Sequence, residues 1–195
     1  MNLRNVFAKV GMTVAAGAVV LTATPSAIAG TAPTPTPAQP AVKALTLPDW
    51  DLGDDHCDDV TIKSKAGNRF VSAEVDYTGY VSGMLRARAT SAGDWEKFSI
   101  CPGNGFYTLY SYSAKGWVTA EQNYTGADAG MLRARAGSVG AWEKFEVQRT
   151  SDYFTLKSLA NGKYVSAELA YTGTGYGMLR ARSTSVGDWE KFQIS

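Results

Sequence analysis

Five residue types whose side chains can recognise a sugar occur three times in this sequence of 195 residues, at one constant spacing. An indole or phenol ring offers an apolar face to the C–H face of a pyranose, and charged groups beside it can bond the hydroxyls. The candidate residues are Glu74, Tyr77, Arg86, Trp95 and Lys97, then Glu121, Tyr124, Arg133, Trp142 and Lys144, then Glu168, Tyr171, Arg180, Trp189 and Lys191.

The spacing between these sets is 47 residues, and it also relates three copies of Gly-Met-Leu-Arg-Ala-Arg, which begin at Gly83, Gly130 and Gly177. A repeat of this length indicates a repeated structural unit. Within each unit apolar and polar residues alternate, as in a half-buried strand. If Leu85 and Ala87 point inward, Arg86 points outward, and the same reasoning places Glu74 and Trp95 outside. The sequence therefore predicts three equivalent, exposed binding clusters.

Other roles are open for each of these residues. A bulge in the strand would turn Trp95 into the core. Glu74 and Arg86 could form a cross-strand ion pair, and Tyr77 could be a packing residue. The turns between the shared residues differ among the repeats, whereas the five candidates are identical in all three. We interpret that identity as favouring a binding role, since a fold needs its core more than its exposed charges.

A catalytic role is not expected. His56 is the only histidine and lies outside the repeats, so a histidine-based nucleophile would have no threefold counterpart. Glu74 and Glu96 could supply two carboxylates for glycoside hydrolysis, but alternation puts Glu96 on the side opposite Trp95. Two cysteines and one histidine fall short of a closed four-ligand zinc site. We expect no enzyme activity, no cofactor and no metal.

Each repeat reads as four short strands separated by turn residues. In the third repeat these are expected at Phe154–Lys157, Tyr164–Glu168, Met178–Arg182 and Glu190–Ile194, with a hairpin turn at Asn161-Gly162. Three four-stranded units are too few for a propeller. The sequence predicts an all-β fold, a β-trefoil of twelve strands with pseudo-threefold symmetry.

The third repeat, Phe-Thr-Leu-Lys-Ser-x-x-Asn-Gly-Lys-Tyr-Val-Ser-Ala-Glu followed by Gly-Met-Leu-Arg-Ala-Arg and Trp-Glu-Lys-Phe, resembles the fascin-type (actin-crosslinking) β-trefoil. The resemblance covers essentially residues 57–195. It rests on Leu156, Gly162, Tyr164, Val165, Ala167, Leu179, Trp189 and Phe192 and their counterparts in the other repeats. It implies the trefoil fold, and it implies either actin crosslinking or, for an exported single domain, carbohydrate binding. The Gln-x-Trp signature of ricin-type lectins is absent.

The first residues have the form of an export signal. Two basic residues precede an apolar run, and Ala27-Ile28-Ala29 fits a cleavage site. The apolar run is shorter than a membrane span. A proline-rich segment follows, which we expect to be an extended tail. The expected organisation is a signal peptide at 1–29, a disordered tail at 30–56 and a trefoil at 57–195 with lobes at 57–101, 102–148 and 149–195.

Export permits a disulfide between Cys57 and Cys101, the only two cysteines, which would join the two ends of the first repeat. The formal net charge is +1, so no electrostatic attraction to nucleic acid or to an anionic membrane is expected. The sequence thus favours a secreted, monomeric, non-catalytic carbohydrate-binding protein with three shallow sites for a polysaccharide such as a β-glucan. The alternatives are a protein-binding or structural fascin-like trefoil, or an inhibitor of an extracellular hydrolase.

Overall fold

The computed structural model describes residues 56–195, and the predicted signal peptide and nearly all of the predicted tail lie outside them. Twelve strands occur in these residues: β1 (Asp58–Ser64), β2 (Arg69–Glu74), β3 (Met84–Ala89), β4 (Lys97–Gly103), β5 (Phe106–Ser111), β6 (Gly116–Ala120), β7 (Leu132–Ala136), β8 (Phe145–Arg149), β9 (Phe154–Ser158), β10 (Lys163–Ala167), β11 (Leu179–Ser183) and β12 (Phe192–Ile194). Short 3-10 turns occur at η1 (Gly79–Val81), η2 (Asp94–Glu96), η3 (Gly126–Asp128) and η4 (Gly173–Gly175).

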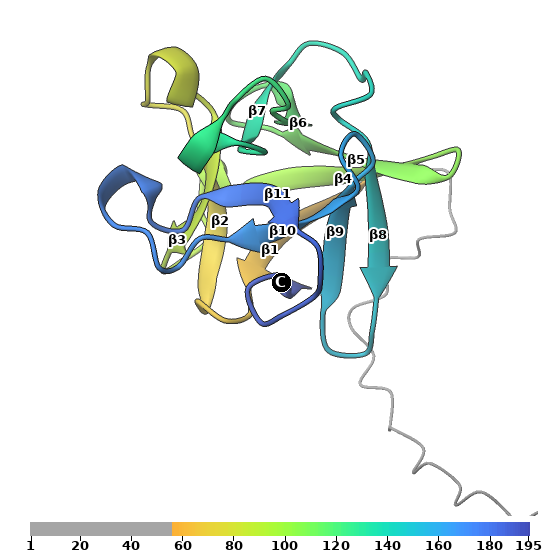
Figure 1. The fold of residues 1–195 in the computed structure, drawn as a ribbon. Coiled ribbons are helices and arrows are strands. Elements are labelled where there is room, and N and C mark those ends of the chain that lie inside the picture. Colours follow the sequence, from red (N-terminus) through yellow and green to blue (C-terminus); the bar gives the residue numbers. More distant parts are fainter. Residues whose placement is uncertain (1–55) are drawn as a thin grey trace, which may run out of the picture. The chain divides into compact units, whose positions relative to one another are not determined.

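Six strands form a closed barrel. Strand β1 pairs with β4 and β12, β4 pairs with β5, β5 with β8, β8 with β9, and β9 with β12, all antiparallel. Each strand of the ring therefore has two neighbours, and the barrel leaves no open sheet edge. In Figure 1 the C-terminal end accordingly lies beside β1.

The other six strands form three hairpins that cap the barrel: β2–β3, β6–β7 and β10–β11. The hairpins also contact one another through antiparallel backbone bridges: Met84 pairs with Arg133, Arg86 with Met178 and Met131 with Arg180. Barrel and cap together form a β-trefoil, which confirms the predicted fold class. The four strands expected in the third repeat are found within two residues of their predicted bounds.

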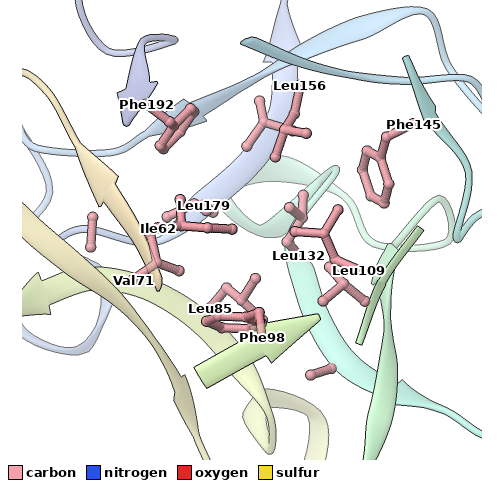
Figure 2. Close-up of a cluster of buried hydrophobic side chains, with 14 of the residues drawn as sticks. Ile62, Val71, Leu85, Phe98, Leu109, Leu132, Phe145, Leu156, Leu179 and Phe192 are labelled. Carbon is pink, nitrogen blue, oxygen red and sulfur yellow. The ribbon is translucent and has the colours of Figure 1, made fainter. Parts of the chain in front are cut away.

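The core is built from the inward positions of all three repeats. It contains the threefold sets Phe98, Phe145 and Phe192, then Leu85, Leu132 and Leu179, then Val71, Val118 and Val165, each at most 1% exposed. Figure 2 shows the phenylalanines and leucines of these sets, with Val71, converging from different strands onto one centre. A second, smaller cluster contains Met84, Met131 and Met178, with Tyr77, Tyr124 and Tyr171 packed against it.

The hairpins approach closely where the Gly-Met-Leu-Arg-Ala-Arg segments begin. The carbonyl of Gly83 accepts a hydrogen bond from Ala134 of the next lobe at 2.8 Å. A Cβ atom built on Gly83 would lie 2.4 Å from the carbonyl oxygen of Ala134, and φ of Gly83 is +72°. Gly130 and Gly177 repeat this approach to Ala181 and Ala87. Only glycine fits here, which explains its place in the repeated motif.

We predict that Gly83→Ala destabilises the fold more than Gly79→Ala does. Both glycines have φ near +70°, but nothing lies within 4 Å of a Cβ on Gly79. Each variant loses about 1–2 kcal/mol for the left-handed backbone, and Gly83→Ala loses about 1–3 kcal/mol more because the added atom overpacks the lobe junction. Denaturant midpoints at equal m-value measure the difference; equal losses would show that the close approach carries no constraint.

The predicted disulfide is present: Cys57 and Cys101 are joined, with their Cα atoms 4.1 Å apart. The two cysteines flank the paired residues Asp58 and Ile100, so the bond fastens the start of β1 to β4. We predict that replacing both cysteines with serine lowers the free energy of unfolding by about 4 kcal/mol through the loop that the bond closes. Chemical denaturation with and without reductant tests this value, and an unchanged midpoint would contradict it.

Candidate functional site

The predicted glutamates and arginines are buried. Glu74, Glu121 and Glu168 are at most 1% exposed, and Arg86, Arg133 and Arg180 are 6–8% exposed. The expectation that they form an exposed face is therefore wrong. Alternation correctly separates them from the barrel core, but the other side of each hairpin is covered by a turn from the neighbouring lobe.

Each of these arginines joins two lobes. Arg86 donates from Nε to the carbonyl of Tyr176 (2.8 Å) and from Nη2 to that of Gly173 (3.0 Å), both in the third lobe. It also donates from Nη1 to the Tyr77 hydroxyl of its own lobe at 2.6 Å. A guanidinium offers five donors in a fixed plane, which suits this multiple capture of carbonyls. We call this arrangement the arginine clamp.

The clamp recurs around the molecule. Arg133 donates to the carbonyls of Ser82 and Gly79 and to the Tyr124 hydroxyl. Arg180 donates to the carbonyls of Ala129 and Gly126 and to the Tyr171 hydroxyl. Each lobe thus holds the lobe before it in cyclic order. The repeated Arg and Tyr are identical because three lobe junctions need them, so their identity no longer argues for ligand binding.

The buried glutamates each bind the second arginine of the motif. Glu74 accepts two hydrogen bonds from Arg88, through Nε and through Nη2 at 2.8 Å. Glu121 with Arg135 and Glu168 with Arg182 form the same pairs. The hydrogen bond to Glu74 raises the pKa of Arg88. Each of these carboxylates is therefore already bound by an arginine of the protein itself.

A second set of glutamates, which the sequence reasoning left without a role, holds the loops before the tryptophans. Glu96 accepts from the Ser72 hydroxyl and from the Gly93 amide at 2.7 Å. Glu143 and Glu190 make the equivalent bonds in their lobes. The recurrence of glutamate after each tryptophan was a visible signal for this structural role.

Trp95, Trp142 and Trp189 are half-buried, so they belong neither to the core nor to the fully exposed surface. The backbone carbonyls of Trp142 and Trp189 accept hydrogen bonds from Ala120 and Ala167 of the adjoining hairpins. A role in sugar binding remains a prediction for these three residues.

The predicted lysines lie at the surface in three settings. Lys97 pairs with Asp94 at 2.8 Å. Lys191 pairs with Asp188 at 2.9 Å, and its Nζ lies 5.3 Å from the centre of the Tyr153 ring. Lys144 lies 4.6 Å from the centre of the Phe106 ring. The lysines therefore contact partners other than the buried glutamates with which they were grouped.

A surface groove of about 360 Å³ opens beside Lys97, lined also by Asp59, Thr61, Tyr112 and Ser195. The Tyr112 side chain is 45% exposed, and its hydroxyl donates a hydrogen bond to Asp59 at 2.5 Å. That bond to the carboxylate raises the pKa of Tyr112, because it stabilises the neutral phenol. The ring is thus held in a defined place next to a carboxylate and an ammonium group.

Tyr112 continues into a row of three aromatic rings. Its ring lies 5.9 Å from that of Tyr110, which lies 5.2 Å from that of Trp117, both in edge-to-face contact. The residues at the positions of Tyr110 and Tyr112 are Lys63 and Lys65 in the first lobe and Lys157 and Leu159 in the third. We call Tyr110, Tyr112 and Trp117 the aromatic row; it occurs in the second lobe alone.

No protein-family model matches the sequence, and comparison with curated proteins finds no match. Solved structures do match. A designed threefold symmetric protein, ThreeFoil, has a TM-score of 0.59 at 19% identity, covering 70% of this chain and 96% of that one. The ricin B-like lectin of Macrolepiota procera, solved with lactose, has a TM-score of 0.55 at 13% identity, covering 71% and 94%.

An exo-beta-1,3-galactanase from Clostridium thermocellum gives a TM-score of 0.58 at 11% identity, covering 76% of this chain but 31% of the enzyme. At such identities these likenesses show the fold alone, and the fold they share is the β-trefoil. Among residues 56–195, no helix is long and apolar enough to cross a membrane, and no group of three His, Cys, Asp or Glu side chains could hold a metal ion.

We predict that Glu121→Gln destabilises the protein by about 3 kcal/mol, because it leaves the guanidinium groups of Arg135 and Arg133 without their buried counter-charge. Asp188→Asn is the control: it removes a carboxylate from an exposed ion pair and should leave the unfolding midpoint unchanged. Thermal and chemical unfolding measure both. An equally stable Glu121→Gln variant would show that the buried pair is dispensable.

Proposed function

We propose that this protein is a secreted, non-catalytic glycan-binding β-trefoil that binds polysaccharide chains on the aromatic row and in the adjoining groove. The observation that carries the proposal is the combination at Tyr112. A partly exposed ring held by a hydrogen bond stands beside Asp59 and Lys97, and further rings extend away from the groove.

The chemistry of this surface suits a sugar chain. The face of an aromatic ring can stack on the C–H face of a pyranose ring. Carboxylate and ammonium groups at one end of the row can bond hydroxyls and fix the direction of the chain. The groove is open to solvent along one side, so we expect selectivity for ring face and linkage and modest affinity for a single sugar.

The likeness to a lectin that was solved with lactose is compatible with this role, although at 13% identity it supports the fold only. Neutral polysaccharides of the β-glucan type are the ligands to test first, since the side chains of the aromatic row carry no charge. This proposal places the binding site on the aromatic row and not on three equal sites at Trp95, Trp142 and Trp189. It also differs from a fascin-like role, in which the partner would be actin.

The test is sedimentation of the mature protein with insoluble β-glucan, cellulose and chitin, and in parallel with filamentous actin. We predict binding to at least one polysaccharide, weakened about 5- to 100-fold by Tyr112→Ala or Trp117→Ala, as for other stacked aromatic contacts. Leu159→Ala is the matched control, because Leu159 is the exposed residue at the position of Tyr112 in the third lobe.

Two results would overturn the proposal. Sedimentation with actin and with none of the polysaccharides would favour the fascin-like alternative. Stepwise loss of polysaccharide binding in Trp95→Ala, Trp142→Ala and Trp189→Ala, with no effect of Tyr112→Ala, would move the sites to the three tryptophans.

A further inference from the structure

The junction between the second and third lobes contains a polar hollow whose amide side chains, Gln122 and Asn161, have no amide counterpart at the other two junctions. Its volume is about 240 Å³, and its charged and amide side chains are those of Glu121, Gln122, Asn161, Lys163, Arg180 and Arg182. It lies apart from the groove at Tyr112, with which it shares no lining residue. The threefold repeat allows the same place to be compared in all three junctions.

At the junction of the third and first lobes, Leu169 occupies the position of Gln122, and Gly67 that of Asn161. A Cβ atom on Gly67 would lie 3.1 Å from Leu169, so the leucine side chain fills that space. At the junction of the first and second lobes the residues are Val75 and Ala114, and the hollow shrinks to about 150 Å³. An apolar side chain therefore takes the place of the polar amides at both other junctions.

The amides at the polar junction are held in place. Gln122 donates to the carbonyl of Ala120 at 2.7 Å, and Asn161 donates to the carbonyl of Ala181 at 2.9 Å. The Asn161 side-chain oxygen also accepts from the Lys163 amide at 3.0 Å. These bonds anchor the Gln122 amide at its nitrogen and the Asn161 amide at both its nitrogen and its oxygen, so the hollow is preformed.

The charges at the hollow favour an anion. Glu121 is occupied by Arg135, and Arg182 is paired with Glu168. Arg180 also lies 3.7 Å from Glu168, whereas the Lys163 ammonium makes no hydrogen bond or ion pair within residues 56–195. Its counterparts in the other lobes are Arg69 and Gly116. A carboxylate entering the hollow could pair with Lys163 without breaking an existing ion pair.

We infer that this junction is a second binding site, for a single acidic sugar unit of a glycan chain. At about 240 Å³ the hollow is smaller than the sites of about 300–1,000 Å³ that take drug-sized ligands, so its size suits one sugar ring rather than a longer segment of chain. The amides of Gln122 and Asn161 can bond ring hydroxyls, while Lys163 binds the carboxylate. The ligand class rests on the proposed glycan binding, but the site itself does not depend on the aromatic row.

The experiment is a chemical-shift titration of the full chain with galacturonate and with galactose, which differ at C6 by a carboxylate in place of a hydroxymethyl group. We expect galacturonate to perturb the amides around Asn161 and to bind about tenfold more tightly than galactose, the gain of one charged hydrogen bond. Gln122→Leu copies the residue of the third lobe and should abolish binding. Lys163→Gln should remove the preference for galacturonate.

Two controls separate this site from the aromatic row. Val75→Leu makes the corresponding change at an apolar junction and should leave galacturonate binding unchanged, as should Tyr112→Ala. Loss of binding in Tyr112→Ala but not in Gln122→Leu, equal binding of galactose and galacturonate, or no binding of either would each overturn the inference. Retention of polysaccharide binding in Gln122→Leu would leave the proposed function standing in each case.

Discussion

The arginine clamp is the interaction on which the rest of this structure depends. Three guanidinium groups, each buried between two lobes, satisfy the carbonyls of the neighbouring turn and the hydroxyl of their own tyrosine. Because every lobe both holds and is held, one or two lobes alone would expose the donors and carbonyls of the open junction to water, without their protein partners. The clamp thereby couples the three repeats into one cooperative unit, and it fixes the hairpin ends from which the surface features extend.

Much of the fold could be predicted because it follows from periodicities within the repeat. The 47-residue spacing and the alternation of apolar and polar residues within each repeat predict the twelve strands, and Leu85 and Ala87 are buried in the core where alternation places them. The disulfide followed from the position of two cysteines at the ends of one repeat. These inferences use only the local geometry of strands and the symmetry of the repeat, and both can be read directly from the sequence.

The site could not be predicted in the same way, since alternation tells which residues share a side but not what covers that side. Arg86 does point away from Leu85, yet the third lobe lies there. Sequence identity among repeats was attributed to binding. For Arg86 it reflects the lobe junction, and for Glu74 it reflects the buried pair with Arg88 of the same hairpin. The surface features instead lie where the repeats differ: Tyr112 against Lys65 and Leu159, and Gln122 against Val75 and Leu169. In an internally repeated protein, shared residues build the scaffold, and departures from the repeat mark candidate sites.

The pairing of β12 with β1 closes the barrel at the point where the first and last strands of the domain meet. The order of the lobes along the polypeptide is therefore a matter of connectivity rather than of packing. A circularly permuted chain that starts at β5 and joins β12 to β1 by a short linker would keep every strand pairing and every clamp.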